Sequence, residues 1–87
     1  MEHVFLKIEA KDNVAVALRA LSKGTSVSSG SERVTLVDDI PAYHKFAVHA
    51  IAKGAGVVKY GERIGDATAD IAPGEHVHVH NVMSRRG

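Results

Sequence analysis

Glycine and proline interrupt this sequence so regularly that a long helix has little room in it. The interruptions fall at Gly24, Gly30, Pro41, Gly54, Gly56, Gly61, Gly65, Pro73 and Gly74. Glycine permits turns that need a positive φ, and proline ends helices and central strands. Turn signals at such spacing are typical of short strands joined by hairpins. The sequence therefore predicts an all-β fold.

The chain has 87 residues and no cysteine. We treat residues 1–87 as a single small domain. A domain of this size buries only about 60% of the surface that its unfolded chain would expose. A domain with so thin a core usually needs a staple or a partner. Without cysteine there is no disulfide framework, and a metal site would need imidazole, carboxylate or carbonyl ligands.

Charge and hydropathy exclude several classes of partner. The net charge is +1, and the basic pair Arg85–Arg86 at the end of the chain is read as a solvated tail. No apolar run approaches the roughly 20 residues of a membrane helix, and the first residues lack the features of a signal peptide. We therefore expect a cytoplasmic protein with no nucleic acid and no membrane as partner.

The expected strands are short stretches rich in β-branched residues. They are 4–9, 14–18, 33–37, 45–49, 57–60, 62–65 and 76–82. The second is ambiguous, because Ala and Leu favour a helix whereas Val14 and Val16 alternate as in a strand; we favour the strand. The segment 27–32, rich in serine and glycine, is expected to be a mobile hairpin tip.

One short phrase occurs three times. The phrase is an apolar residue, any two residues and then glycine, and it occurs at 21–24, 51–54 and 71–74. The phrase is too short for a solenoid repeat. It indicates one hairpin device used three times.

The most informative segment for function is His76-Val77-His78-Val79-His80-Asn81. In a strand, alternate side chains share one face, so His76, His78 and His80 would lie together at intervals of about 6.6–7 Å. Two imidazoles at such a spacing can converge on one cation, and neutral imidazole is also a common acid, base and metal ligand. The alternative is a plain solvent-exposed strand face, although strict alternation favours a functional one.

Other candidate residues are less distinctive. His44 and Lys45 form a cationic pair near a turn that can bind a carboxylate, although an exposed polar turn would look the same. His3 and His49 are expected to be surface or structural histidines. The motifs G-x-S-x-G, H-E-x-x-H and the P-loop are absent from the sequence, so a complete enzyme is not expected from this chain alone.

An ordered set of phrases spans nearly the whole chain. They are 12–18, 34–36, 39–41 with 44–47, 58–61 with 64–65, 69–72 and 74–81. Together they resemble the N-terminal domain of the altronate and galactarate dehydratase family, which also occurs as a separate small subunit. The alpha subunit of sulfolactate sulfo-lyase is similar. The resemblance implies a SAF-type β-clip fold of short strands and hairpins.

The resemblance also implies a function. Members of this family remove water from a sugar acid to give a 2-keto-3-deoxy acid, with a divalent metal, typically iron. The small domain docks on a large catalytic subunit or domain, and the metal would be bound mainly by that larger partner. On this basis His76, His78 and His80 are the expected catalytic side chains, His44, Lys45 and Asn81 the substrate-binding ones, and His78 and His80 the candidate metal ligands.

Two alternatives stay open at this point. A sulfolactate sulfo-lyase subunit would release sulfite instead of water, and a non-catalytic SAF module would bind a carbohydrate or a protein. One residue departs from the family pattern, because glycine is common at the position of Tyr43. Tyrosine adopts a positive φ reluctantly, so we expect this turn, and with it the place of His44, to differ.

Overall fold

The computed structural model describes residues 5–6, 12–29, 32–59 and 61–84, and all regular structure in them is β-strand. The strands are β1 (Phe5–Leu6), β2 (Val14–Ala17), β3 (Ser26–Ser29), β4 (Glu32–Thr35), β5 (Lys45–Ala47), β6 (Gly56–Lys59), β7 (Glu62–Ala67), β8 (His76–Val77) and β9 (Val82–Ser84). The all-β prediction is confirmed. No helix capable of crossing a membrane occurs in the described ranges.

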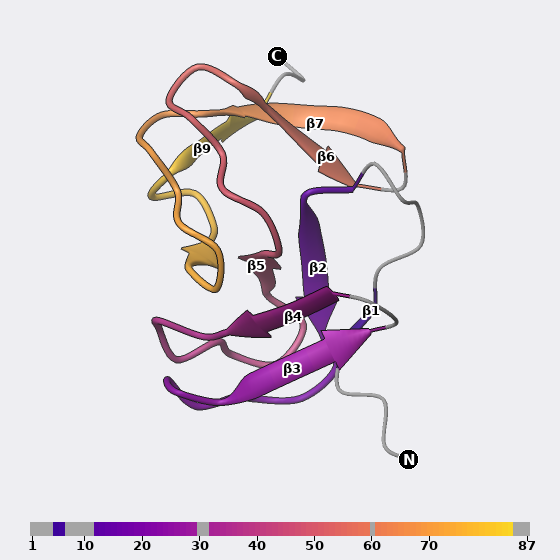
Figure 1. Cartoon of the computed structure of the whole chain (residues 1–87). Coiled ribbons are helices and arrows are strands. Elements are labelled where there is room, and N and C mark those ends of the chain that lie inside the picture. The colour runs from indigo at the N-terminus through magenta and orange to yellow at the C-terminus, as the bar shows by residue number, and fades with distance from the viewer. Residues whose placement is uncertain (1–4, 7–11, 30–31, 60, 85–87) are drawn as a thin grey trace.

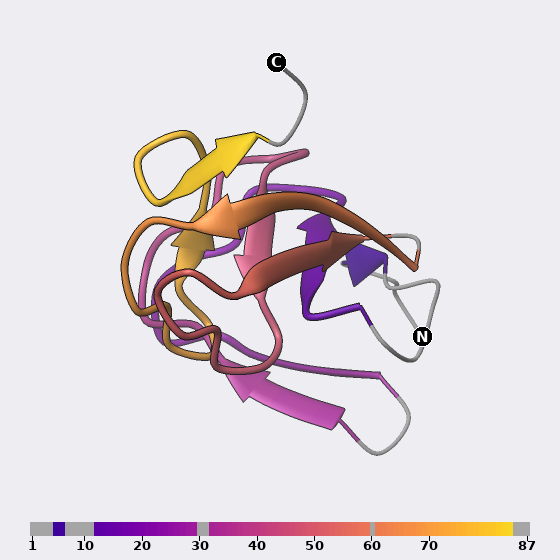
Figure 2. The same ribbon diagram turned by 90° about the horizontal axis from the view of Figure 1, so that it is seen from above.

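A four-stranded antiparallel sheet, in the order β1-β2-β5-β8, forms the centre of the molecule. The β3–β4 hairpin lies on one side of it, and the three-stranded sheet β6-β7-β9 lies on the other (Figure 1). Seen from above, β6 and β7 run across the strands of the central sheet (Figure 2). This arrangement agrees with the SAF-type β-clip that the resemblance implies.

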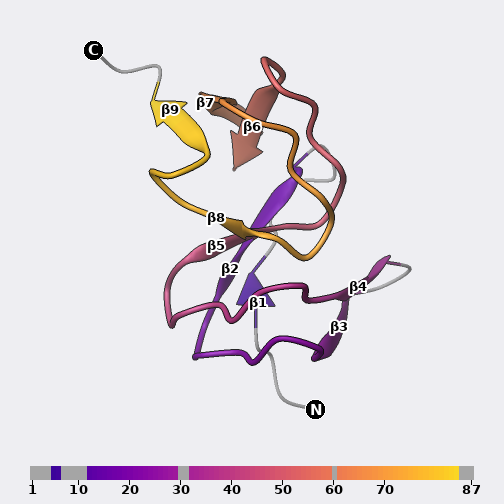
Figure 3. The ribbon, with the colours of Figure 1, turned by 90° about the vertical axis from the view of Figure 1, so that its left-hand side faces the viewer.

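Side-chain alternation along the central strands divides the apolar residues between two cores. Ala15 of β2 faces Phe46 of β5 in one core, whereas Val14 faces Ala47 in the other. The first core comprises Ala15, Ala17, Leu21, Val27, Val34, Leu36, Ile40, Phe46 and Val48. The second comprises Val14, Ala47, Ile51, Val57, Ala67, Ile71 and Val77. The central sheet is therefore buried on both faces, and its β8 edge lies beside β5 (Figure 3).

The repeated phrase of the sequence is a tight turn, which occurs four times among the described residues. Each copy begins at a buried aliphatic residue in an isolated bridge, Leu21 paired with Ile40 and Ile51 with Ile71. Each closes with a backbone hydrogen bond across three residues, from Thr25, His44, Ala55 and Glu75 back to Ser22, Pro41, Ala52 and Ala72. The third residue of the turn has a positive φ in all four. This is the geometry of a type II turn.

The fourth copy, at 40–43, carries Tyr43 where the others carry glycine. The expectation that this turn differs is wrong, because Tyr43 adopts φ 67 and the turn closes like the rest. The left-handed conformation costs about 1–2 kcal/mol for a residue with a Cβ. Two backbone hydrogen bonds with Ala17 hold the turn. The N–H of Tyr43 donates to the carbonyl of Ala17 (2.8 Å), and the N–H of Ala17 donates to the carbonyl of His44 (2.9 Å). His44 is therefore placed as a glycine-containing turn would place it.

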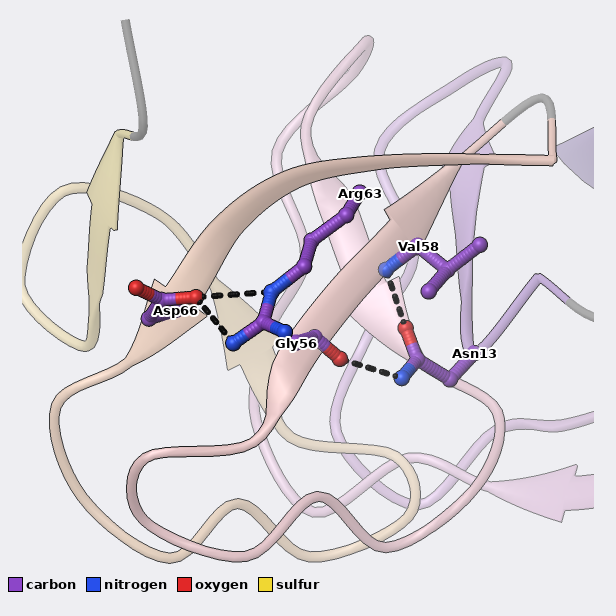
Figure 4. A network of polar contacts seen from close by, with 5 residues as sticks. All are labelled: Asn13, Gly56, Val58, Arg63 and Asp66. Atoms are coloured by element: carbon purple, nitrogen blue, oxygen red, sulfur yellow. Dashed lines mark hydrogen bonds and ion pairs between the residues drawn. The ribbon is translucent and has the colours of Figure 1, made fainter. Parts of the chain in front are cut away.

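Asn13 links the start of the central strand β2 to β6 of the three-stranded sheet β6-β7-β9 through two hydrogen bonds. Its Nδ2 donates to the carbonyl of Gly56 (2.9 Å), and its Oδ1 accepts from the N–H of Val58 (2.8 Å) (Figure 4). A Cβ at Gly56 would overlap the side chain of Arg63, which reaches past it to Asp66. Glycine at this position thus leaves room for the Arg63–Asp66 ion pair on the sheet surface.

Most strand predictions are confirmed, and a hairpin is present where one is expected, but its strands extend further into the segment 27–32 than predicted. Residues 27–29 and 32 belong to β3 and β4, with Val27 buried and the hydroxyl groups of Ser26 and Thr35 in contact at 3.0 Å. Cross-strand pairing and the burial of Val27 explain why the strands extend into a segment rich in serine and glycine. Residues 30–31 and most of the expected strand 4–9 lie outside the described residues.

The turn at Gly74 is expected to be much less tolerant of a side chain than the turn at Gly24. Both glycines have a positive φ, but a Cβ at Gly74 would overlap the carbonyl of Thr35, whereas one at Gly24 meets nothing within 4 Å. Gly24→Ala should lower the free energy of unfolding by about 1–2 kcal/mol, from backbone strain alone. Gly74→Ala should cost about 1–3 kcal/mol more because of overpacking. Urea unfolding of both variants checks this, and equal losses would contradict it.

Candidate functional site

Four imidazoles gather at the β8 edge of the central sheet. His76 is in β8, His44 directly precedes β5, and His78 and His80 follow β8. Ring centroids of His44 lie 5.1 Å from His76 and 4.5 Å from His78. Those of His76 lie 5.7 Å from His78 and 5.3 Å from His80. We call these four residues the imidazole cluster.

The prediction of one strand over 76–82 is wrong, because β8 ends at Val77 and residues 78–81 form a turn. Val77 is buried, whereas Val79 is 82% exposed and does not face the core. The turn closes with a backbone hydrogen bond from Asn81 N to the carbonyl of His78 (3.1 Å). The rings of His76, His78 and His80 therefore collect because the chain folds back, and not because alternate residues share a strand face.

Asn81 is the residue that folds the chain back. It is buried, and its Oδ1 accepts from the N–H of His78 (3.0 Å) while its Nδ2 donates to the carbonyl of His76 (2.8 Å). The Nδ2 group also contacts Oε2 of Glu75 at 3.4 Å. These contacts give Asn81 a positioning role, and its contact with a substrate stays a prediction.

His44 and His76 come from segments 32 residues apart and share a hydrogen bond of 2.9 Å between Nδ1 of His44 and Nε2 of His76. One of these nitrogens carries the proton and the other accepts it, so at most one of the two facing positions is protonated. The backbone N–H of His76, on the edge strand, donates to Oδ2 of Asp38 (3.0 Å). The first contact positions the His76 ring, and the second positions its backbone.

The environment lowers the pKa of His76 below its ordinary value of 6.5. Burial is the largest cause, followed by the neighbouring His44, His80 and His78, whereas Asp38 acts in the opposite direction. His76 is therefore neutral at pH 7 and has a lone pair to offer. Neutral imidazole is the form that ligates metals.

The cluster also has the geometry of a ligand set. One ring nitrogen each from His44, His76 and His78 lie within 4.8 Å of one another. Converging imidazole nitrogens suit divalent iron, zinc or copper. Of the two sequence-predicted ligands, this set includes His78 and does not include His80; a ligand role for His80 stays a prediction.

A groove adjoins the cluster on the side of the three-stranded sheet β6-β7-β9. It has a volume of about 380 Å³ and is lined by Lys45, Ile64, Val77, His78, Val79, Val82 and Ser84. Burial, and secondarily the charge of Lys59, lower the pKa of Lys45. Within the described part of the chain no carboxylate forms an ion pair with Lys45, so this ammonium group can accept an anionic partner from outside.

The structure unites His44 and the three histidines near the C-terminus, a contact that the sequence reasoning did not foresee. The only local signal was the turn at 40–43, which matches the other three once Tyr43 is aligned with their glycines. His49 is exposed, as expected, and is not a member of the cluster. His3 lies outside the described residues.

Comparison with known proteins gives a consistent set of relatives. A family model described as the altronate/galactarate dehydratase SAF domain matches residues 3–85. The altronate dehydratase of Escherichia coli K12 is 58% identical over 80 residues, which cover 92% of this chain. That of Bacillus subtilis 168 is 44% identical over the same length. The alpha subunit of (2R)-sulfolactate sulfo-lyase from Paracoccus pantotrophus is 44% identical over 54 residues, or 62% of this chain.

The relatives differ greatly in how much of them is matched. The chain spans 16% of the length of either altronate dehydratase. The match spans 81% of the sulfo-lyase alpha subunit from Paracoccus. The chain is therefore similar to a small part of the former proteins and to most of the latter.

The lowered pKa of His76 predicts a loss of stability in mild acid. As the pH falls below 6.5, the unfolded chain binds a proton at this residue before the folded chain does. The free energy of unfolding should therefore decrease as the pH falls from 6.5 to the lowered pKa. Above pH 6.5 the full stability is present. Urea unfolding with EDTA from about pH 8 to about pH 5 checks this. His76→Asn should flatten the dependence, and parallel curves for the two proteins would refute the prediction.

Proposed function

This chain belongs to the altronate/galactarate dehydratase SAF domain family, and on that premise we propose that it lends its imidazole cluster to the active site of a hydro-lyase. A larger catalytic subunit or domain completes that site. The substrate is a sugar acid of the altronate type, and the product is a 2-keto-3-deoxy acid. The observation that carries the proposal is the gathering of four imidazoles, two of them exposed, at one sheet edge.

The proposed reaction needs two proton transfers. A base removes the proton next to the carboxylate, the C–O bond to the β-hydroxyl breaks, and that hydroxyl takes a proton and leaves as water. The resulting enol converts to the keto acid. His80 is exposed and lies outside the converging ring nitrogens of His44, His76 and His78, so its protonated ring would be free to reach a substrate hydroxyl. The base at the carbon would come from the larger portion.

The donor set of this chain fits the divalent metal that the family resemblance implies. His44, His76 and His78 would hold it, since their ring nitrogens converge and His76 is neutral at pH 7. When bound, such an ion polarises the departing hydroxyl as a Lewis acid. Lys45, which has no ion-pair partner among the described residues, would hold the substrate carboxylate. Asn81 would keep His78 in place through the hydrogen bond to its N–H.

The second candidate function is that of a sulfolactate sulfo-lyase alpha subunit. The observation that favours it is size, because the match spans 81% of the Paracoccus subunit. The same cluster would then act where sulfite, and not water, leaves the β-carbon.

A chimera tests the proposed chemistry. In it, this chain replaces the 80 matching residues of the Escherichia coli altronate dehydratase, and turnover is measured on altronate, galactarate and sulfolactate. His78→Ala should lower kcat by about 100-fold or more, because it removes one of the proposed metal ligands, and even residues outside the ligand shell commonly contribute about 10–100-fold. His49→Ala, an exposed histidine outside the cluster, is the matched control and should leave kcat unchanged. Preference for sulfolactate would favour the second candidate.

Two outcomes contradict the proposal. Equal turnover by the His78→Ala chimera and the parent chimera would remove His78 from the chemistry. A folded parent chimera that converts none of the three acids would favour a non-catalytic binding module.

A further inference from the structure

The groove beside the imidazole cluster lies between two sheet edges. One wall comes from β5 and β8 through Lys45 and Val77, and the other from β7 and β9 through Ile64, Val82 and Ser84. Both β8 and β9 are last in the order of their sheets among the described strands. His78 belongs to the groove lining and to the imidazole cluster at once. Whatever occupies the groove therefore lies directly against the proposed active site.

Except at Lys45, which directly follows His44 of the imidazole cluster and is the proposed contact of the substrate carboxylate, the lining is too aliphatic for a polyhydroxylated acid. Ile64, Val77, Val79 and Val82 provide most of it, and substrate hydroxyls against these side chains would lose their hydrogen bonds to water without replacement. Val79 is 82% exposed and is the most exposed of the large apolar side chains described. Covering such side chains is favourable by roughly 25 cal/mol per Å² of apolar surface. The groove thus suits an apolar protein segment.

We propose that an extended, largely aliphatic segment of the larger catalytic portion docks in this groove. The inference rests on the proposed function, in which such a portion completes the site. The span of the relatives supports it, because the greater part of each altronate dehydratase lies outside the 16% matched by this chain. Since His78 forms part of the groove, a segment seated there also brings the larger portion to the imidazoles.

Single cysteines provide a footprint of the docking surface that does not depend on activity. The chain has no cysteine of its own, so Ser84→Cys places one thiol in the groove lining. Ser28→Cys is the matched control, since Ser28 is likewise an exposed serine in a strand. It lies in the β3–β4 hairpin, on the far side of the central sheet from β7 and β9 (Figure 1).

Alkylation rates of each thiol are measured in the free chain and in the full chimera with the Escherichia coli enzyme, by mass spectrometry of the labelled peptide. In the chimera Ser84→Cys should react at least about 10-fold more slowly than in the free chain, because an interface core excludes solvent. Ser28→Cys should react equally fast in both. Equal reactivity of Ser84→Cys in both proteins would overturn the proposal.

Two further readouts separate the possible failures. Protection of Ser84→Cys in the free chain that grows with concentration would identify a second copy as the occupant and overturn the proposal. Protection in a chimera without turnover would leave docking supported and the proposed chemistry refuted. Turnover without protection would refute docking alone. The His78→Ala chimera should keep the protection while losing turnover.

Discussion

The site depends on one buried side-chain amide, that of Asn81. It accepts from the N–H of His78 and donates to the carbonyl of His76, so the chain turns sharply where β8 would otherwise continue. An extended strand would hold alternate imidazoles at about 6.6–7 Å along a line. The turn instead returns His78 and His80 toward His76 and, through it, toward His44. A buried amide with its bonding capacity in use is costly to lose, and the amide of Asn81 is buried with three groups in contact with it.

The repeated turn sets the frame in which that amide acts. Its four copies pair across the molecule, Leu21 with Ile40 and Ile51 with Ile71, and each fixes the start of the strand that follows. Two copies lead into β5, which His44 directly precedes, and into β8, which contains His76. One of these contains Tyr43 in a left-handed conformation that glycine would adopt at lower cost. The strain lies one residue from His44, at the rim of the cluster, and hydrogen bonds to Ala17 hold it.

Local pattern predicted much of this fold. The strands near 14–18 and 45–49, the absence of a long helix, and a turn at three of the four repeated phrases follow from residue types alone. The prediction of a strand at 76–82 was wrong because alternating His and Val imitate a strand. Only the contacts of Asn81 reveal the turn, and these contacts are local in sequence but depend on burial. The pairing of His44 with His76 spans 32 residues. No periodicity predicts such a contact, which arises from the β5–β8 register that joins Phe46 to His76.

We propose that imidazoles from two distant segments form a single ligand set. Metal binding by the free chain tests this most directly. Titration with Co²⁺, followed by visible absorption, should give one site in the parent chain. His44→Ala should weaken that site by at least about 10-fold, since even residues outside the ligand shell commonly contribute as much, whereas His49→Ala should bind like the parent. If His44→Ala bound Co²⁺ as tightly as the parent chain, His44 would not belong to the set and the shared site would be refuted.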